Sequence, residues 1–323
     1  MIFGEVPLER AEGLILAHTM VLETGKLIKG RRLGPAEVEA LRAAGLSGVT
    51  GCTVEPGDLD ENQAARAVAQ ALAGDGIGLG PASTGRCNLF ARHHGVLEID
   101  SSRVGRLNRV DEAVTAATVA PWSVVKPGQR VATVKIIPFA VAAGTVHACA
   151  AAAGKARPPV AVRPFRARRV GMILTTLPGI SPASLDTAVA VTHRRVEDLG
   201  GGLDQEIRCP HRPEALDRAI AQALDGGCEI LLISGALVTT DRRDTVPAAI
   251  TRAGGVIVHF GMPAEPGNML LLARIGPVPV LVLPSCARSG ALNGLDLILR
   301  RIMADIPVEG RDIMDMGVGG LLD

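Results

Sequence analysis

The sequence has few aromatic residues, with five Phe, one Trp and no Tyr in 323 positions. Proteins that hold single-stranded nucleic acid stack its bases on aromatic side chains, and this composition supplies little material for such a surface. The charges nearly cancel, giving a formal net charge of +1, whereas nucleic-acid binders usually carry a strong basic excess. We therefore expect no nucleic-acid partner and a core built mainly of Leu, Val, Ile and Ala.

Long hydrophobic runs are also missing. Apolar stretches such as ILLISGALV are soon interrupted, and a membrane span needs roughly 20 apolar residues. The opening MIFGEVPLER lacks the basic start and apolar run of a signal peptide. The six Cys are scattered without a CxxC pair, which favours free thiols over disulfides. These features predict a cytoplasmic protein with no membrane association.

Lysine is scarce, and the last one along the chain is Lys155. An anion bound by the second half would therefore be held by Arg, backbone N–H groups and helix N-termini. A codon-composition bias explains the same skew equally well.

The segment Ala150–Arg169 is rich in Ala, Pro and Arg without periodicity, which predicts a linker. We expect an α+β domain over residues 1–160, an α/β domain over residues 166–310 and a C-terminal tail over residues 311–323.

The second half alternates between apolar runs and helical patterns. Strands are expected at 170–176, 204–209, 229–234, 256–260 and 279–283. Helices are expected after Ser181-Pro182, from Pro213, after Asp244 and after Ser289. Continuous apolar strands alternating with helices are typical of a three-layer domain with a mostly parallel sheet covered on both faces. The smaller first domain is less regular, with helices expected near 35–44 and 60–72 and a β-hairpin over Ser123–Val141 that turns at Pro127-Gly128.

Four expected strands lead into loops of small and polar residues. Ligands bind beyond the carboxyl ends of strands in such sheets, and free N–H groups at helix N-termini attract anions. The candidate ligand-binding residues in these loops are Thr175, Thr176, Ser234, Gly235, Ala236, Pro266, Gly267, Asn268, Ser285, Arg288 and Ser289.

The stretch ILLISGALVTTDRRDTVP is the most informative of the chain. Gly235 allows a ligand to approach the backbone, and Asp241 and Asp244 flank two arginines. Carboxylates can hold a hydrated Mg²⁺ or the amino edge of a ligand, and arginines can hold phosphate. Alternatively, Asp244 caps the next helix and Asp241 is a solvated loop acid.

The second half resembles the molybdopterin-binding domain of molybdopterin adenylyltransferases and molybdopterin molybdotransferases. Ser234–Asp244 is similar to the Gly-Gly loop and Asp of that family. Pro266-Gly267-Asn268 and Leu283-Pro284-Ser285 fall where the molybdotransferases carry Pro-Gly-Lys-Pro and Leu-Pro-Gly-Asn-Pro. A group of bacterial molybdopterin-binding proteins resembles the whole chain, sharing TGRCNLFA, VATVKIIPFAV, TDRRD, HFGMP, PGN, CARS and the Met-Gly-Val-Gly-Gly end.

Several family residues are replaced in this sequence. Ala236 stands for the second loop glycine, and His211 stands where an acid is expected. The Gly-Asp-Glu of the molybdotransferases and the Lys of Pro-Gly-Lys-Pro are absent. The ligand-binding loops are therefore better retained than the catalytic groups.

The resemblance implies binding of molybdopterin, a pterin phosphate, or of another molybdenum-cofactor intermediate, with Asp241 and Asp244 as catalytic or Mg²⁺-binding acids. An active enzyme would transfer adenylate or molybdate. The alternatives are a non-catalytic cofactor carrier and an unrelated small-molecule phosphate binder. Expected partners are a nucleotidyltransferase-like domain or a molybdoenzyme, and we expect a homo-oligomer.

Two further candidates lie outside these acids. Cys87 with His93 and His94 could form a metal cluster, although the spacing is not typical of zinc. Cys286 could act as a nucleophile or metal ligand, or could simply pack in the interior.

Overall fold

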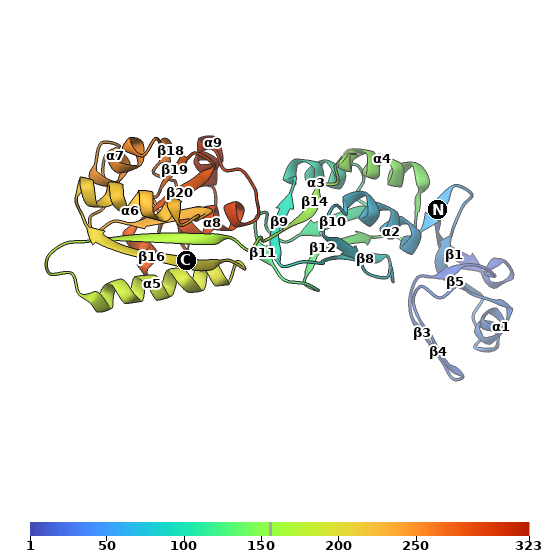
Figure 1. The fold of residues 1–323 in the computed structure, drawn as a ribbon. Helices are drawn as coiled ribbons and strands as arrows, with labels where there is room; N and C mark the ends of the chain where they lie inside the picture. Colours follow the sequence, from blue (N-terminus) through green and yellow to red (C-terminus); the bar gives the residue numbers. More distant parts are fainter. Residues whose placement is uncertain (155–156, 323) are drawn as a thin grey trace. The chain divides into compact units, whose positions relative to one another are not determined.

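The computed structural model describes residues 1–154 and 157–322. The chain divides into two compact units of nearly equal length, Met1–Val162 and Arg163–Asp323. Figure 1 shows strands and helices in both. This differs from the expected organisation in two respects: the first unit is not the smaller one, and residues 311–322 belong to the second unit.

The first unit is α+β. Its helices are α1 (Pro35–Ala43), α2 (Glu61–Leu72), α3 (Ser101–Asn108) and α4 (Ala143–Ala153). Its strands are β1 (Ile2–Pro7), β2 (Ile15–Leu16), β3 (Met20–Leu22), β4 (Gly25–Leu27), β5 (Gly48–Thr53), β6 (Asp58–Asp60), β7 (Ile77–Leu79), β8 (Arg86–Ala91), β9 (Gly95–Ile99), β10 (Val114–Thr118), β11 (Val124–Val125), β12 (Arg130–Ile136), β13 (Ala140–Ala142) and β14 (Val160–Pro164).

Two predictions for this region are wrong. Ser123–Val141 is not a hairpin, because β11 pairs with β9, β12 with β8 and β10, and β13 with β6. Much of the expected linker Ala150–Arg169 is also structured: α4 ends at Ala153, β14 covers Val160–Pro164, and Arg169 begins a strand. Lys155 and Ala156 lie outside the described residues.

The second unit contains a six-stranded sheet in the order β16-β15-β17-β20-β19-β18. The strands are β15 (Arg169–Thr176), β16 (Gly202–Pro210), β17 (Ile230–Ser234), β18 (Val256–Phe260), β19 (Leu271–Ile275) and β20 (Val278–Leu283). β15 pairs in parallel with both β16 and β17, and β17 pairs in parallel with β20. β19 pairs antiparallel with both β18 and β20, so it runs opposite to the other five strands of this sheet. The expected α/β class and mostly parallel sheet are confirmed, while β19 was not predicted.

The helices of this unit are α5 (Pro182–Glu197), α6 (Pro213–Asp225), α7 (Thr245–Arg252), α8 (Gly294–Met303) and α9 (Gly310–Met314). Short 3-10 turns cover Ser285–Arg288 and Asp315–Gly317, as Leu8–Arg10 does in the first unit. The expectation that Ser289 caps the last long helix is wrong. Asn293 caps α8 instead, accepting the N–H of Leu295, whereas Ser289 ends the 3-10 turn before it.

The sheet buries both faces. Along β17, Ile230 and Leu232 belong to one cluster of buried side chains, which also includes residues of α5 and α8. Leu231 and Ile233 belong to a second cluster, together with residues of α6 and α7. Since successive side chains of a strand point to opposite faces, two helix pairs cover opposite faces of the sheet.

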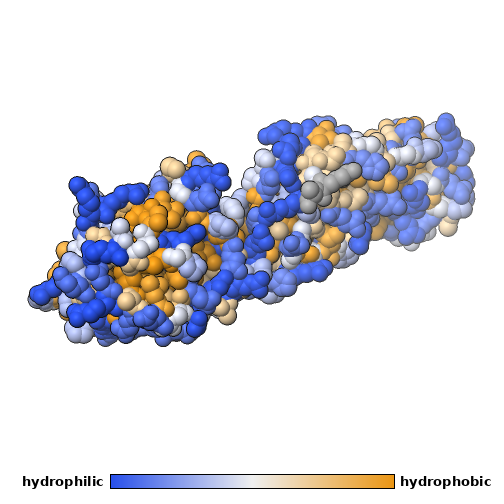
Figure 2. Space-filling model, turned by 45° about the horizontal axis from the view of Figure 1, so that its top comes forward, coloured by the Kyte–Doolittle hydropathy of each residue, from blue (hydrophilic) through white to orange (hydrophobic). Residues whose placement is uncertain are grey.

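The C-terminal residues complete the first of these clusters. Ile313 and Met316 are buried in it, and the backbone of Glu265 bonds to Gly320 and Leu322. Hydrophobic residues also reach the surface, and Figure 2 shows a patch of them on the second unit, on the left, surrounded by hydrophilic residues. Among the described residues, no helix is long and apolar enough to cross a membrane.

Candidate functional site

The loops that follow β15, β17 and β20 lie at the carboxyl edge of the six-stranded sheet. Leu174 pairs with Ser234, and Ser234 pairs with Leu283, so these strands end at nearly the same level. The loop after β15 leads to α5 on one face, and the loop after β17 leads to α7 on the other. Loops that diverge in this way leave a crevice between them, which is where open α/β sheets bind ligands.

A cavity of about 70 Å³ lies at this edge. Typical small-molecule sites measure about 300–1,000 Å³, so this one has room for a single group such as phosphate and not for a whole pterin. Five of the sequence-predicted residues line it, namely Ser234, Gly235, Ala236, Ser285 and Arg288, together with Leu237, Val238, Thr239, Met269, Leu283 and Pro284.

Two largely buried residues with hydroxyl groups line the cavity. Ser234 is 5% exposed and Thr239 is 6% exposed. Neither hydroxyl has a hydrogen-bond partner among the described residues. Neither hydroxyl oxygen is among the fully buried side-chain atoms that lack a partner, so both are accessible and can bond to a polar ligand or to water.

The backbone of the same loop adds further donors. Within the described chain, the N–H groups of Leu237, Val238 and Thr239 donate to no protein acceptor. Gly235 makes the sharp turn possible, because a Cβ at this position would lie 2.7 Å from the carbonyl oxygen of Leu237. Successive free N–H groups in a turn favour anion binding.

Thr175 connects the ends of β15, β16 and β17 through hydrogen bonds. This residue is 1% exposed, and its hydroxyl oxygen accepts the N–H of Ala236 at 2.7 Å. The same oxygen lies 2.8 Å from Nδ1 of His211, which directly follows β16. The predicted binding residue Ala236 therefore has its N–H engaged within the protein, and Thr175 positions the loop without lining the cavity.

Two arginines shape the loop after β20. Arg288 donates to the carbonyl oxygen of Gly235 at 2.8 Å, which joins this loop to the one after β17. Arg195 of α5 is 9% exposed and donates to the carbonyl oxygens of Ala287, Ser289 and Ala291. It also pairs with Asp296 at 2.9 Å. The rest of the Arg288 guanidinium has no partner among the described residues, so it can meet an anion.

The two acids predicted to be catalytic or metal-binding are both engaged in the loop. Asp244 caps α7, with one carboxylate oxygen accepting the N–H of Thr245 and the other that of Thr240. Asp241 pairs with Arg243 at 2.9 Å, and the hydrogen bonds from Arg243 hold the pKa of Asp241 below its usual range. Neither acid lines the cavity.

The remaining predicted residues lie elsewhere on the same edge. Pro266, Gly267 and Asn268 pack beside the start of α8: Pro266 accepts the N–H of Gly294, and Gly267, with φ of 131°, lies against the backbone of Gly294. Asn268 donates to Glu265. Thr176 donates to the carbonyl of Cys209, and Ser289 to that of Cys286.

The side chains predicted as metal ligands include the two loop acids and two cysteines. The described part of the chain contains no group of three or more His, Cys, Asp or Glu able to hold one. This includes Cys87, which is fully buried. Burial raises the pKa of Cys286, which opposes a reactive thiolate. All six cysteines are free, as predicted.

The sequence does not predict that Thr239, Met269, Leu237 and Val238 line the cavity. A Thr-Thr pair follows ILLISGALV, but nothing in the sequence indicates which hydroxyl turns inward. Met269 comes directly after the predicted Asn268, so proximity to that loop was the available signal.

No protein-family model matches the chain, and no curated protein matches it. Among solved structures, a molybdopterin biosynthesis MoeA protein from Pyrococcus horikosii is similar, with 14% identity and a TM-score of 0.33 over 94% of this chain and 75% of that one. MogA matches at 13% identity and a TM-score of 0.28, over 42% of this chain and 94% of that one. A molybdopterin biosynthesis protein from Mycobacterium abscessus matches at 12% identity and a TM-score of 0.30, over 43% and 92%. At these identities and TM-scores the matches carry no functional conclusion for this chain.

Proposed function

We propose that the second unit binds a phosphorylated pterin, molybdopterin or a related molybdenum-cofactor intermediate, at the carboxyl edge of its sheet, and acts in the synthesis or maturation of that cofactor. The observation that carries the proposal is that residues with free donor groups line one cavity: Ser234 and Thr239 with their hydroxyls, residues 237–239 with their backbone N–H groups, and Arg288 with its guanidinium. These groups lie largely in the segment whose sequence resembles the molybdopterin-binding family.

The cavity is large enough for only one part of such a ligand. A volume of about 70 Å³ accommodates the phosphate alone, and its donors suit an anion. The pterin would then lie outside, against Leu237 and Val238, which are 54% and 48% exposed. Apolar side chains beside a polar pocket are the usual lining for such a heterocycle.

We favour a binding or carrier role over catalysis of adenylate or molybdate transfer. Such transfer depends on metal ions and charge neutralisation at the reacting phosphate. Asp241 is paired with Arg243, and both oxygens of Asp244 accept backbone N–H groups. No third acid completes a metal site with them in the described chain.

A fluorescence titration of the full chain with molybdopterin tests the proposal. We expect saturable binding, weakened at least tenfold by Arg288→Gln and unchanged in the control Arg311→Gln, since Arg311 is an exposed residue of α9 that pairs with Glu309. Equal affinity in wild type and Arg288→Gln, or no binding at all, would contradict the proposal.

A second pair of measurements distinguishes the alternatives. Single-turnover product formation with molybdopterin, ATP and Mg²⁺, or with adenylated molybdopterin and molybdate, would identify a transferase. Saturable binding of inorganic phosphate without any molybdopterin binding would identify an unrelated phosphate binder.

A further inference from the structure

A second and larger cavity lies at the opposite, amino edge of the same sheet. Its volume is about 350 Å³, within the range of about 300–1,000 Å³ typical of small-molecule sites. Ile230 and Pro279 stand at the starts of β17 and β20. On the antiparallel β19, Arg274 pairs with Val256 and Pro279, at the same edge. None of the lining residues belongs to the candidate pterin site.

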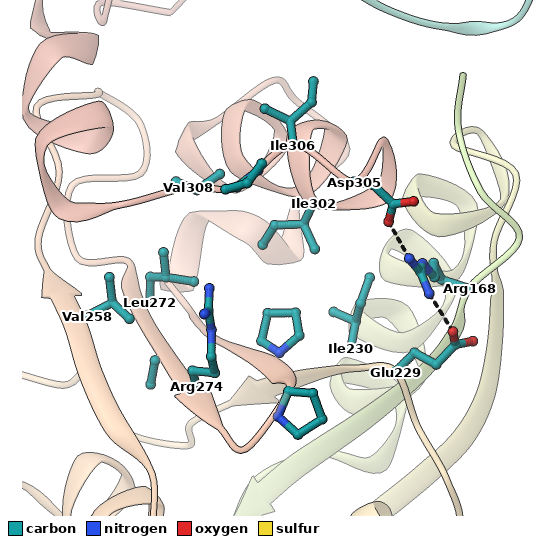
Figure 3. A pocket seen from close by; sticks show the side chains of 14 residues that line it. Arg168, Glu229, Ile230, Val258, Leu272, Arg274, Ile302, Asp305, Ile306 and Val308 are labelled. Carbon is teal, nitrogen blue, oxygen red and sulfur yellow. Dashed lines mark hydrogen bonds and ion pairs between the residues drawn. The ribbon is translucent and has the colours of Figure 1, made fainter. Parts of the chain in front are cut away.

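The cavity wall is mostly aliphatic. Side chains of β17, β18 and β19 form one side, and the end of α8 with the following segment forms the other, as Figure 3 shows. The apolar lining residues are Ile230, Val258, Leu272, Ala273, Pro277, Pro279, Ile302, Ile306, Pro307 and Val308. Such a wall favours a ligand with an apolar body.

The charges around the cavity are paired, with one exception. Arg168 contacts both Glu229 and Asp305, and hydrogen bonds from these two acids raise its pKa. Arg169 lies 3.7 Å from Glu229, and Arg166 lies 3.5 Å from Asp305, so both acids are neutralised. The backbone of Arg274 belongs to the β-ladder, but its guanidinium has no ion pair or hydrogen bond with any described residue, and it points into the cavity in Figure 3.

We propose that this cavity binds a small organic carboxylate with an aliphatic or arylalkyl body, whose carboxylate pairs with Arg274. A forked guanidinium matches a carboxylate with two donors, while the aliphatic wall covers the body. A nucleotide fits poorly, because no aromatic side chain lines the cavity for base stacking and a single free cation cannot neutralise a polyphosphate. A metal ion fits poorly as well, since both acids are engaged by arginines.

The experiment is isothermal titration calorimetry of the full chain with hexanoate, octanoate and 4-phenylbutyrate, and with octanamide as the uncharged counterpart. We expect saturable one-to-one binding of at least one carboxylate, at least tenfold tighter than octanamide. Arg274→Gln should weaken carboxylate binding at least tenfold, whereas Arg274→Lys should retain part of it. The control Arg311→Gln should bind as wild type does.

Two results would overturn the proposal: no saturable binding of any of the three carboxylates, or equal binding by wild type and Arg274→Gln. Arg274 is exposed on β19, so its substitution should leave the fold intact, and a circular dichroism melt of each variant checks this. Molybdopterin binding at the other edge of the sheet is measured separately, so either site can fail without the other.

Discussion

The hydroxyl oxygen of Thr175 accepts a hydrogen bond from the backbone N–H of Ala236 at 2.7 Å. This single contact holds the loop after β17 to the end of β15. It lies where the loops after these two strands diverge toward opposite faces of the sheet. The backbone donors of residues 237–239 follow directly, so their placement depends on it.

Thr175→Val should loosen the cavity and destabilise the second unit. Valine keeps the shape of threonine but leaves the N–H of Ala236 without a partner, which costs about 1–3 kcal/mol when the group is buried. Urea unfolding should show this loss, and molybdopterin affinity should fall with it. Thr175→Ser retains the hydroxyl and should recover most of both, and a valine variant as stable and as tight-binding as wild type would contradict the role assigned to the contact.

Arg195→Met should be among the most destabilising substitutions on this side of the sheet. Arg195 is 9% exposed and holds three carbonyl oxygens as well as Asp296. Removing one member of a buried ion pair costs about 3–5 kcal/mol. The matched control is Arg243→Met, because the side chain of Arg243 is 92% exposed and pairs at the surface contribute little. Equal unfolding midpoints for the two variants would contradict the prediction that Arg195 contributes more to stability than Arg243.

Acidification should destabilise the second unit partly through Glu229. The N–H of Arg169 and the guanidinium of Arg168 hold its pKa below the usual value of 4.5. A carboxyl with a lowered folded-state pKa stabilises the fold above its usual pKa, and this contribution disappears as pH falls through the lower, folded value. Urea midpoints measured against pH should therefore fall less steeply for Glu229→Gln than for wild type. Asp225→Asn, at the exposed end of α6, serves as the control for removing one surface carboxylate.

Leu237→Ala should separate binding from folding. The side chain of Leu237 is 54% exposed, so its truncation should change stability by no more than about 0.5 kcal/mol. If the pterin lies against this residue, molybdopterin affinity should drop severalfold while inorganic phosphate binds as before. Unchanged molybdopterin affinity would place the heterocycle elsewhere.

The fragment Arg166–Asp323 should fold and bind molybdopterin as the full chain does. Both clusters of buried side chains in the second unit are made of residues within it, and the N–H of Arg166 bonds to Met303. Circular dichroism and the same fluorescence titration check this. A folded fragment without affinity would mean that the first unit contributes to the site.

Local patterns were enough for much of the second unit. Val256–Phe260 forms a strand over the predicted residues, and Pro213 opens a helix as expected. The predictions failed where partners come from far along the chain. Ser123–Val141 alternates like a hairpin, but its strands pair with β6, β8, β9 and β10 instead. An alternating pattern defines a strand with one buried face and does not identify its neighbour.

The candidate site divides in a similar way. The sequence by itself determined which loops follow the buried strands, since apolar runs, Gly and Pro are local signals, and it placed Ser234, Gly235, Ser285 and Arg288 among them. Only the tertiary structure decided what each residue does there. Thr239 enters the cavity, Asp241 turns to Arg243, Asp244 caps a helix, and Thr175 holds Ala236. The physical reason is that hydrogen bonds and ion pairs depend on a few ångströms of placement, and packing between distant segments sets that placement.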